Sequence, residues 1–189
     1  VWVRAGRPGD GRINSILLLG DGTETSDVGL LVEGHDHAFS VIDARKGSNP
    51  LGFVGSIGPI GSVTTGGGII GAPLGGLETP GGRELAADID GDGRIEDRTA
   101  LYAAGSANRF AVNGHLRGDA VVNRGLKMLR TIGGDAMGDV RVGENGGRLM
   151  AIGGSFAGDV NVGRNLDFLM ALKGDINGAV NVGSDAGTI

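Results

Sequence analysis

The most distinctive chemical feature of the sequence is an acidic stretch, DIDGDGRIED, that begins at Asp88. Its first three carboxylates fall at alternate positions, and Gly93 follows the third. This is the beginning of an EF-hand calcium loop, in which carboxylates converge on one hard cation and a glycine makes the sharp turn. The residue after the glycine supplies a backbone carbonyl oxygen, and later acidic residues can complete the coordination. The sequence therefore predicts a calcium site formed by Asp88, Asp90, Asp92, Arg94, Glu96 and Asp97.

The end of this motif departs from the EF-hand pattern. Loop position 12, normally an acidic bidentate ligand, is Thr99, and Asp97 lies two positions earlier. Asp97 can replace the missing ligand in a shortened loop, and the alternative is a solvated acidic turn. The segment IEDRTALYAA (95–104) is predicted to form a short helix after the loop. The loop resembles the calcium loops of dockerin-type extracellular proteins, but dockerins carry a pair of loops, so cohesin binding is not implied.

Other residue patterns give no firm site. Glu33, His35 and His37 alternate, so a strand would place them on one face, where they can bind zinc; the alternative is a surface loop, because Gly34 weakens a strand. The sequence GGGIIG (66–71) has dinucleotide-motif spacing without the required helix or acidic residue, and glycine abundance explains it. No Ser, His and Asp arrangement resembles a nucleophile elbow, so we expect no enzyme activity.

The scaffold that positions these residues is a repeat. Four phrases spaced by 20 residues begin at Gly114, Gly134, Gly154 and Gly174, and the last three contain GDV at Gly138, GDV at Gly158 and GAV at Gly178. Apolar and more polar residues partly alternate, as in half-buried strands. Glycine costs about 1 kcal/mol per residue in a helix, which argues against stacked helical pairs. We therefore predict an all-β fold, a β-solenoid (parallel β-helix) with coils of about 20 residues, interrupted by the short helical EF-hand-like calcium loop.

Stacked coils place equivalent residues of successive repeats directly above one another, about 4.8 Å apart. Val140, Val160 and Val180 are expected to form an aliphatic column inside the solenoid. Glycine is expected at the corners because tight turns require positive φ, which glycine adopts without steric cost.

Two columns of polar residues are expected at the corners. They consist of Asp119, Asp139 and Asp159, and of Asn145, Asn165 and Asp185. Aspartates at such positions ordinarily accept hydrogen bonds from turn N–H groups, and stacked amides can bond along the column. The alternative is a carbohydrate lyase that presents the carboxylates to substrate, but no column of Arg or Lys accompanies them.

The composition and net charge indicate the kind of core and argue against several classes of partner. Glycine accounts for 40 of 189 residues and aromatic residues for only 4%, which favours a thin aliphatic core over one built on rings. The net charge of −5 argues against nucleic-acid binding. No apolar run approaches the roughly 18 residues of a membrane span. Because the chain has no Cys, the calcium loop is the expected staple.

We predict three parts along the chain. Residues 1–80 form irregular Gly-rich β coils or an antiparallel cap, residues 81–107 form the calcium-loop insertion, and residues 108–189 form the regular coils. RFAVNG (109–114) resembles the later RLMAIGG with one residue missing. The sequence ends inside an unfinished coil, so either further sequence or another subunit is expected to complete it.

The phrase GDVNVGRNLDFLMALKGDI (158–176) resembles the coils of repetitive bacterial cell-surface and secreted β-solenoid proteins. It is similar, more distantly, to bactofilins, β-helices that polymerise end to end. The resemblance implies a bacterial extracellular or cell-surface location and a homo-oligomer or fibre joined through the solenoid ends. The expected function is structural, a calcium-stapled subunit of an extracellular fibre or surface layer. The alternatives are an adhesin-like module that binds glycans or proteins and a polysaccharide lyase or hydrolase on a β-helix.

Overall fold

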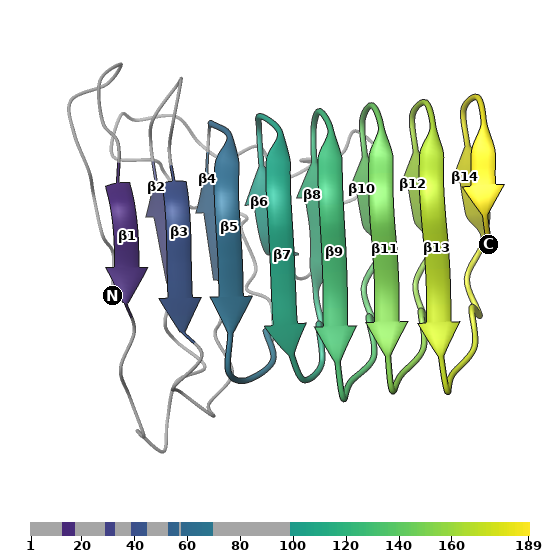
Figure 1. Cartoon of the computed structure of the whole chain (residues 1–189), viewed down its shortest axis with the longest axis horizontal. Helices are drawn as coiled ribbons and strands as arrows, with labels where there is room; N and C mark the ends of the chain where they lie inside the picture. Colours follow the sequence, from purple (N-terminus) through teal and green to yellow (C-terminus); the bar gives the residue numbers. More distant parts are fainter. Residues whose placement is uncertain (1–12, 18–28, 33–38, 45–52, 57, 70–98) are drawn as a thin grey trace.

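The structure, a computed structural model, describes residues 13–17, 29–32, 39–44, 53–56, 58–69 and 99–189. These residues form a parallel β-solenoid in which 15 strands alternate between two sheets (Figure 1). One sheet has 8 strands and the other 7, and neighbours within each sheet are one coil apart. The prediction of a parallel β-solenoid with coils of about 20 residues is confirmed.

Odd-numbered strands form the eight-stranded sheet and even-numbered strands form the seven-stranded sheet. The eight-stranded sheet contains β1 (Ile13–Leu17), β3 (Phe39–Ala44), β5 (Ile60–Thr65), β7 (Ala107–Asn113), β9 (Leu126–Ile132), β11 (Gly146–Ile152), β13 (Leu166–Leu172) and β15 (Ala186–Thr188). The seven-stranded sheet contains β2 (Gly29–Val32), β4 (Phe53–Ser56), β6 (Thr99–Ala103), β8 (Asp119–Val122), β10 (Val140–Val142), β12 (Val160–Val162) and β14 (Val180–Val182).

Each regular coil has a third, shorter side between the long strand and the short one. There a single residue per coil makes a parallel bridge to the equivalent residue of the next coil. The bridging residues are Ile69, Leu116, Ala136, Phe156 and Ile176. The coil is therefore a flattened triangle, with corners at the glycine-containing turns between its three sides.

The 20-residue register predicted from the repeat is observed. Val140 pairs with Val160, and Val160 pairs with Val180, so the three side chains form one column. Val140 and Val160 are fully buried, and Val180 packs partly buried against the same core. Aliphatic residues with β-branched side chains suit this position because they pack well on a pleated surface and are stiff at χ1.

The interior is mostly aliphatic, with two aromatic exceptions. Phe110 and Phe156 are among the largest fully buried side chains and belong to the core cluster. Phe156 neighbours Ala136 in the bridging column, so a large side chain is accommodated beside a small one. The other members of the core cluster are aliphatic, as the composition predicted.

Most corner glycines are required for a reason other than the positive φ that the sequence predicted. Among the described glycines, positive φ occurs at Gly114, Gly133 and Gly153, which follow the long strands. Gly158 and Gly163 have no such φ. A Cβ at either would lie well inside 3.0 Å of the backbone carbonyl one coil below. These glycines are required because stacked backbones approach closely.

The predicted helix over residues 95–104 is wrong where the structure describes it. Thr99–Ala103 forms strand β6, in which Leu101 pairs with Val54 of β4 and with Ala120 of β8. All five residues of β6 are buried. Sheet pairing on both sides and burial override the helical preference of the alanine-containing sequence. No helix occurs in the part of the chain that the structure describes.

The early strands belong to the same stack as the regular coils. β4 pairs directly with β6, and β5 pairs directly with β7, although residues 66–98 separate β5 from β6 in sequence. The long connection therefore leaves the sheet pairing uninterrupted. The coil that contains Phe110 is one residue shorter than the later coils, as the sequence indicated. Phe110 pairs with Leu129, which is 19 residues away instead of 20.

Two buried threonines of the eight-stranded sheet give a matched test of polar burial. Thr65 donates a hydrogen bond of 2.5 Å to the Gly67 carbonyl, whereas the Thr131 hydroxyl has no hydrogen-bond partner among the described residues. Both side chains are at most 1% exposed, and Val112 lies between them in the same column. We expect Thr131→Val to raise the free energy of unfolding by about 1 kcal/mol and Thr65→Val to lower it by a similar amount. Urea unfolding of both variants tests this; equal losses in both would contradict it.

Candidate functional site

The residues of the predicted calcium site lie outside the described residues. Asp88, Asp90, Asp92, Arg94, Glu96 and Asp97 belong to the connection between β5 and β6. Glu33, His35 and His37 also lie outside the described ranges. Within the described ranges, no group of three or more His, Cys, Asp or Glu side chains could hold a metal ion. Calcium binding by the loop therefore remains a prediction.

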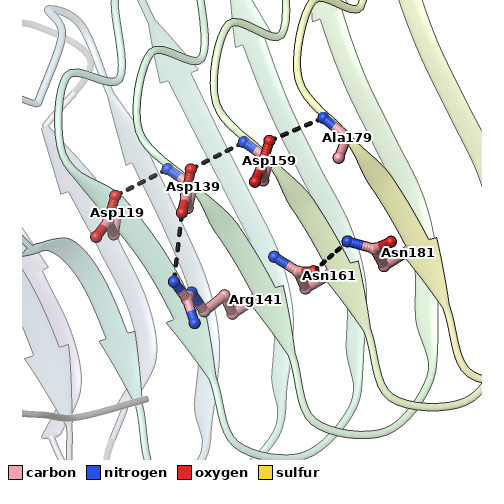
Figure 2. Close-up of polar contacts among 7 residues, drawn as sticks. All are labelled: Asp119, Asp139, Arg141, Asp159, Asn161, Ala179 and Asn181. Atoms are coloured by element: carbon pink, nitrogen blue, oxygen red, sulfur yellow. Dashed lines mark hydrogen bonds and ion pairs between the residues drawn. The ribbon is translucent and has the colours of Figure 1, made fainter. Parts of the chain in front are cut away.

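The aspartate column is a ladder of hydrogen bonds between coils (Figure 2). Asp119 Oδ1 accepts from the backbone N–H of Asp139, and Asp139 Oδ1 accepts from that of Asp159. Asp159 Oδ1 accepts from the N–H of Ala179, and all three distances are 2.8 Å. The predicted role of the carboxylates as acceptors for turn N–H groups is confirmed, with the donor in the next coil.

Two further columns use the same arrangement. One runs through His115, Asp135, Ser155 and Asp175, where the side chain of each of the first three accepts from the backbone N–H of the next, at 2.8–3.1 Å. The other runs through Asn145, Asn165 and Asp185, with weaker contacts of 3.4 and 3.3 Å. The amides of this second column thus bond along the stack, but to backbone N–H groups. Each coil therefore presents polar acceptors toward the following one.

The aspartate ladder gives a direct test of what its side chains contribute. Asp139 also lies 3.4 Å from the Arg141 guanidinium through its Oδ2. We expect Asp139→Ala to lower the free energy of unfolding by about 1 kcal/mol, because the Asp159 N–H loses its acceptor. Asp139→Asn keeps an acceptor oxygen and should cost less than half as much. If thermal unfolding shows equal losses for Ala and Asn, charge matters more than hydrogen-bond acceptance.

A shallow groove follows the outer face of the seven-stranded sheet along β10, β12 and β14, with the buried Val121 of β8 at one end. Arg141, Asn161 and Asn181 line it, and stacked glycines lie beside them at positions 143, 163 and 183. Asn181 donates from Nδ2 to Asn161 Oδ1 at 2.9 Å (Figure 2). The groove combines one paired cation with neutral amides, which are groups that hydrogen-bond to hydroxyls and carbonyls.

The same outer face is apolar and covered in the earlier coils. Gly55, Tyr102 and Val121 occupy the column that continues as Arg141. Tyr102 is 9% exposed and Val121 2% exposed, although neither belongs to the interior core cluster. Burial raises the pKa of Tyr102, and a hydrogen bond to Asn123 acts in the opposite direction. Among the members of this column whose burial the structure describes, exposure to solvent begins at Arg141, where the column becomes polar.

The interior opens to solvent at the last coil. β14 and β15 each have a strand neighbour on one side only. Ile176, Val180 and Val182 continue the core columns but are only partly buried. A hollow at this end is lined by core residues of β13 and by Ile189, which is 61% exposed. We call this surface, with Asp175 and Asp185 at its corners, the C-terminal edge.

Sequence reasoning missed two of these polar arrangements. The His115 column was detectable, because the residue after the first glycine of each phrase is polar in all four phrases. The Asn161–Asn181 pair was detectable only once this strand position was known to face outward. The sequence does not show this, because the equivalent residue of an earlier coil, Val121, is apolar.

Comparison of the chain with protein-family models, with curated proteins and with solved structures finds no match. None of the described residues forms a helix of the length and apolarity needed to cross a membrane.

Proposed function

We propose that the chain is a structural protein, a calcium-stapled β-solenoid subunit of a bacterial extracellular fibre or surface layer that assembles end to end. The observation that carries the proposal is the uniform parallel stacking, in which each coil pairs with the next in one register and offers side-chain acceptors to its backbone N–H groups. An unpaired strand edge is a template for pairing with another chain. A second copy is the occupant with the matching geometry.

Strand direction supports this mode of assembly. All strands of the eight-stranded sheet are parallel (Figure 1), and in the strand order β1 and β15 are its two ends. A second copy in the same orientation can therefore place its β1 beside β15 with the parallel pairing used throughout the sheet. Such a head-to-tail contact is heterologous and gives an open filament unless the rotation closes a ring.

The side-chain ladders favour a coil as the occupant of the edge. Asp135 and Ser155 accept hydrogen bonds from the coil that follows, and Asp175 occupies the same column at the edge. Asn165 accepts from Asp185, which continues the second column. Both carboxylates lie where a further coil would present its backbone N–H groups. Parallel columns thus supply polar acceptors around an apolar centre.

Assembly is tested with the purified chain by electron microscopy and analytical ultracentrifugation. We expect filaments or a concentration-dependent series of oligomers for the unmodified chain. Val180→Lys places a charge in a core column at the edge and should abolish assembly, while Asn181→Lys on the outer face of the same strand should not. Circular dichroism checks that both variants keep their β structure. Dispersed monomers of the unmodified chain at all concentrations would overturn the proposal.

Calcium is tested separately, because the sheet pairing continues across the connection that contains the motif. We expect calcium to raise the unfolding temperature, with a stabilisation of about 2.7 kcal/mol at a concentration 100 times Kd. Asp88→Asn combined with Asp90→Asn should remove the effect, and Asp167→Asn on β13 should retain it. Filaments that persist in chelator with no calcium-induced shift would refute the staple and leave the end-to-end assembly standing.

The groove favours a second candidate function, an adhesin-like module that binds glycans. Asn161 and Asn181 lie at the regular coil spacing, and neutral amides are suited to hydroxyl groups. Glycan-array binding that is lost in Asn161→Leu, by a chain that forms no filaments, would support this candidate over the structural one.

A further inference from the structure

The outer face of the eight-stranded sheet carries an apolar strip on β9, β11 and β13, the large front strands of Figure 1. Nine positions form three columns across these strands, and seven of them are large apolar residues. We define the apolar strip as Met128, Phe168, Met150, Met170, Ile132, Ile152 and Leu172. The two remaining positions are Arg130 and Arg148.

The apolar strip is a surface feature and not part of the interior. Its members are partly exposed, none belongs to the core cluster, and Leu172 is 46% exposed. The equivalent positions of the earlier coils are small or polar: Ser62, Thr64, Arg109, Ala111 and Asn113. All four methionines of the chain lie on the surface, three of them in this strip. Contiguous exposed apolar residues of this kind mark interaction sites.

Positive charge surrounds the apolar strip. The three strands and the residue that follows β13 carry Lys127, Arg130, Arg148 and Lys173 against a single carboxylate, Asp167, a net charge of +3. The whole chain has a net charge of −5. This face therefore carries a net positive charge, on a chain that is acidic overall.

One of these cations occupies a strained position. Lys173 has φ +70°, at the corner where the preceding coils have Gly133 and Gly153 with φ of +71° and +83°. A residue with a Cβ is disfavoured in this left-handed region, and such strain is found mainly where function requires the residue. The position of Lys173 is an observation independent of the apolar strip, and it adds a cation at the strip's end.

The area and the charge of this face indicate which kind of partner binds it. Three strands about 4.8 Å apart and seven residues of about 3.3 Å give a face on the order of 300 Å². A stable protein interface buries about 800 Å² on each partner, and a second copy of this face would bring like charges together. An anionic lipid surface requires no matching area and attracts each cation by about 1 kcal/mol, while the apolar residues enter the headgroup region.

We propose that this face binds anionic membrane surfaces, with the apolar strip against the lipid and the four cations contacting headgroup phosphates. Binding of this kind is peripheral and reversible, and it weakens as salt increases. It uses a different surface from end-to-end assembly, because most of the strip lies along the side of the solenoid, although Phe168 and Met170 also line the hollow at the C-terminal edge.

The test is co-sedimentation of the full chain with vesicles of phosphatidylglycerol and phosphatidylcholine, compared with phosphatidylcholine alone. We expect binding to the anionic vesicles only. Lys173→Gly removes one cation and relieves the strained φ, so it should bind about five-fold more weakly while unfolding at a higher temperature. A structural role alone cannot produce this combination. Leu172→Ser should also weaken binding, through the apolar strip.

Two matched variants serve as controls. Arg164→Gln removes a cation at the other end of β13, and Met137→Ser removes an equally exposed apolar side chain, 49% exposed, that lies outside the strip. Both should bind like the unmodified chain. Equal binding to neutral vesicles, or no binding to anionic vesicles, would overturn the proposal. A concentration-dependent dimer that Leu172→Ser dissociates, without vesicle binding, would instead assign the face to a second copy.

Discussion

Gly163→Ala is expected to lower the free energy of unfolding by about 3 kcal/mol or more, a very large effect for the addition of one methyl group. The added Cβ would overlap the backbone carbonyl oxygen of Gly143, one coil below. No side-chain rotation can relieve this contact, because the obstacle is backbone. The two coils would have to separate, and the pairing of β10 with β12 would be lost. Urea unfolding followed by circular dichroism measures the change.

Gly125→Ala is the matched control. Gly125 lies at the same corner of an earlier coil, but a Cβ there would be 3.7 Å from its nearest neighbour, the Asn145 carbonyl oxygen. Its φ is not in the left-handed region. We expect a change within about 0.5 kcal/mol, or a slight stabilisation from the reduced entropy of the unfolded chain. Similar losses for both variants would show that close stacking of backbones is not what requires Gly163.

The second large effect is expected from Phe156→Ala, which should cost about 3–5 kcal/mol. Phe156 is 1% exposed and is one of the largest fully buried side chains. Its neighbour below in the bridging column is Ala136, so removal of the ring would leave two alanines in succession and an empty volume between them. The cost combines lost apolar burial with the cavity that remains.

Exchanging Phe156 and Ala136 tests whether stability depends on the total side-chain volume of the column or on which coil carries the ring. Ala136→Phe alone should overpack the column beside Phe156 and cost about 1–3 kcal/mol. Combined with Phe156→Ala, it restores the total volume, so the double variant should be more stable than Phe156→Ala alone. A double variant with the full sum of the two losses would mean that the ring is required at its own coil.

The architecture could be predicted from sequence because stacking imposes the same environment on every twentieth residue. Val140, Val160 and Val180 share one column, and their identity reports that environment directly. The role of the aspartates was also predictable, since a carboxylate after a corner glycine has a backbone donor nearby. The donor's position in the next coil followed only from the observed register.

Other features could not be read from the repeat. Strand β6 lies after the long connection, outside the periodic region, and its sequence carries helical propensity that sheet pairing overrides. Glycine at a corner has two distinct physical causes, and a sequence cannot distinguish positive φ at Gly153 from backbone contact at Gly163. The apolar strip was hidden for a related reason, because outer and inner apolar columns look alike without the strand orientation.

Neighbouring strands in each sheet lie one coil apart throughout the described residues. Each coil therefore packs mainly against the coil before it and the coil after it, so energetic coupling along the stack is short-ranged. A destabilising change in one coil is expected to weaken its two neighbours first, and more distant coils only through them.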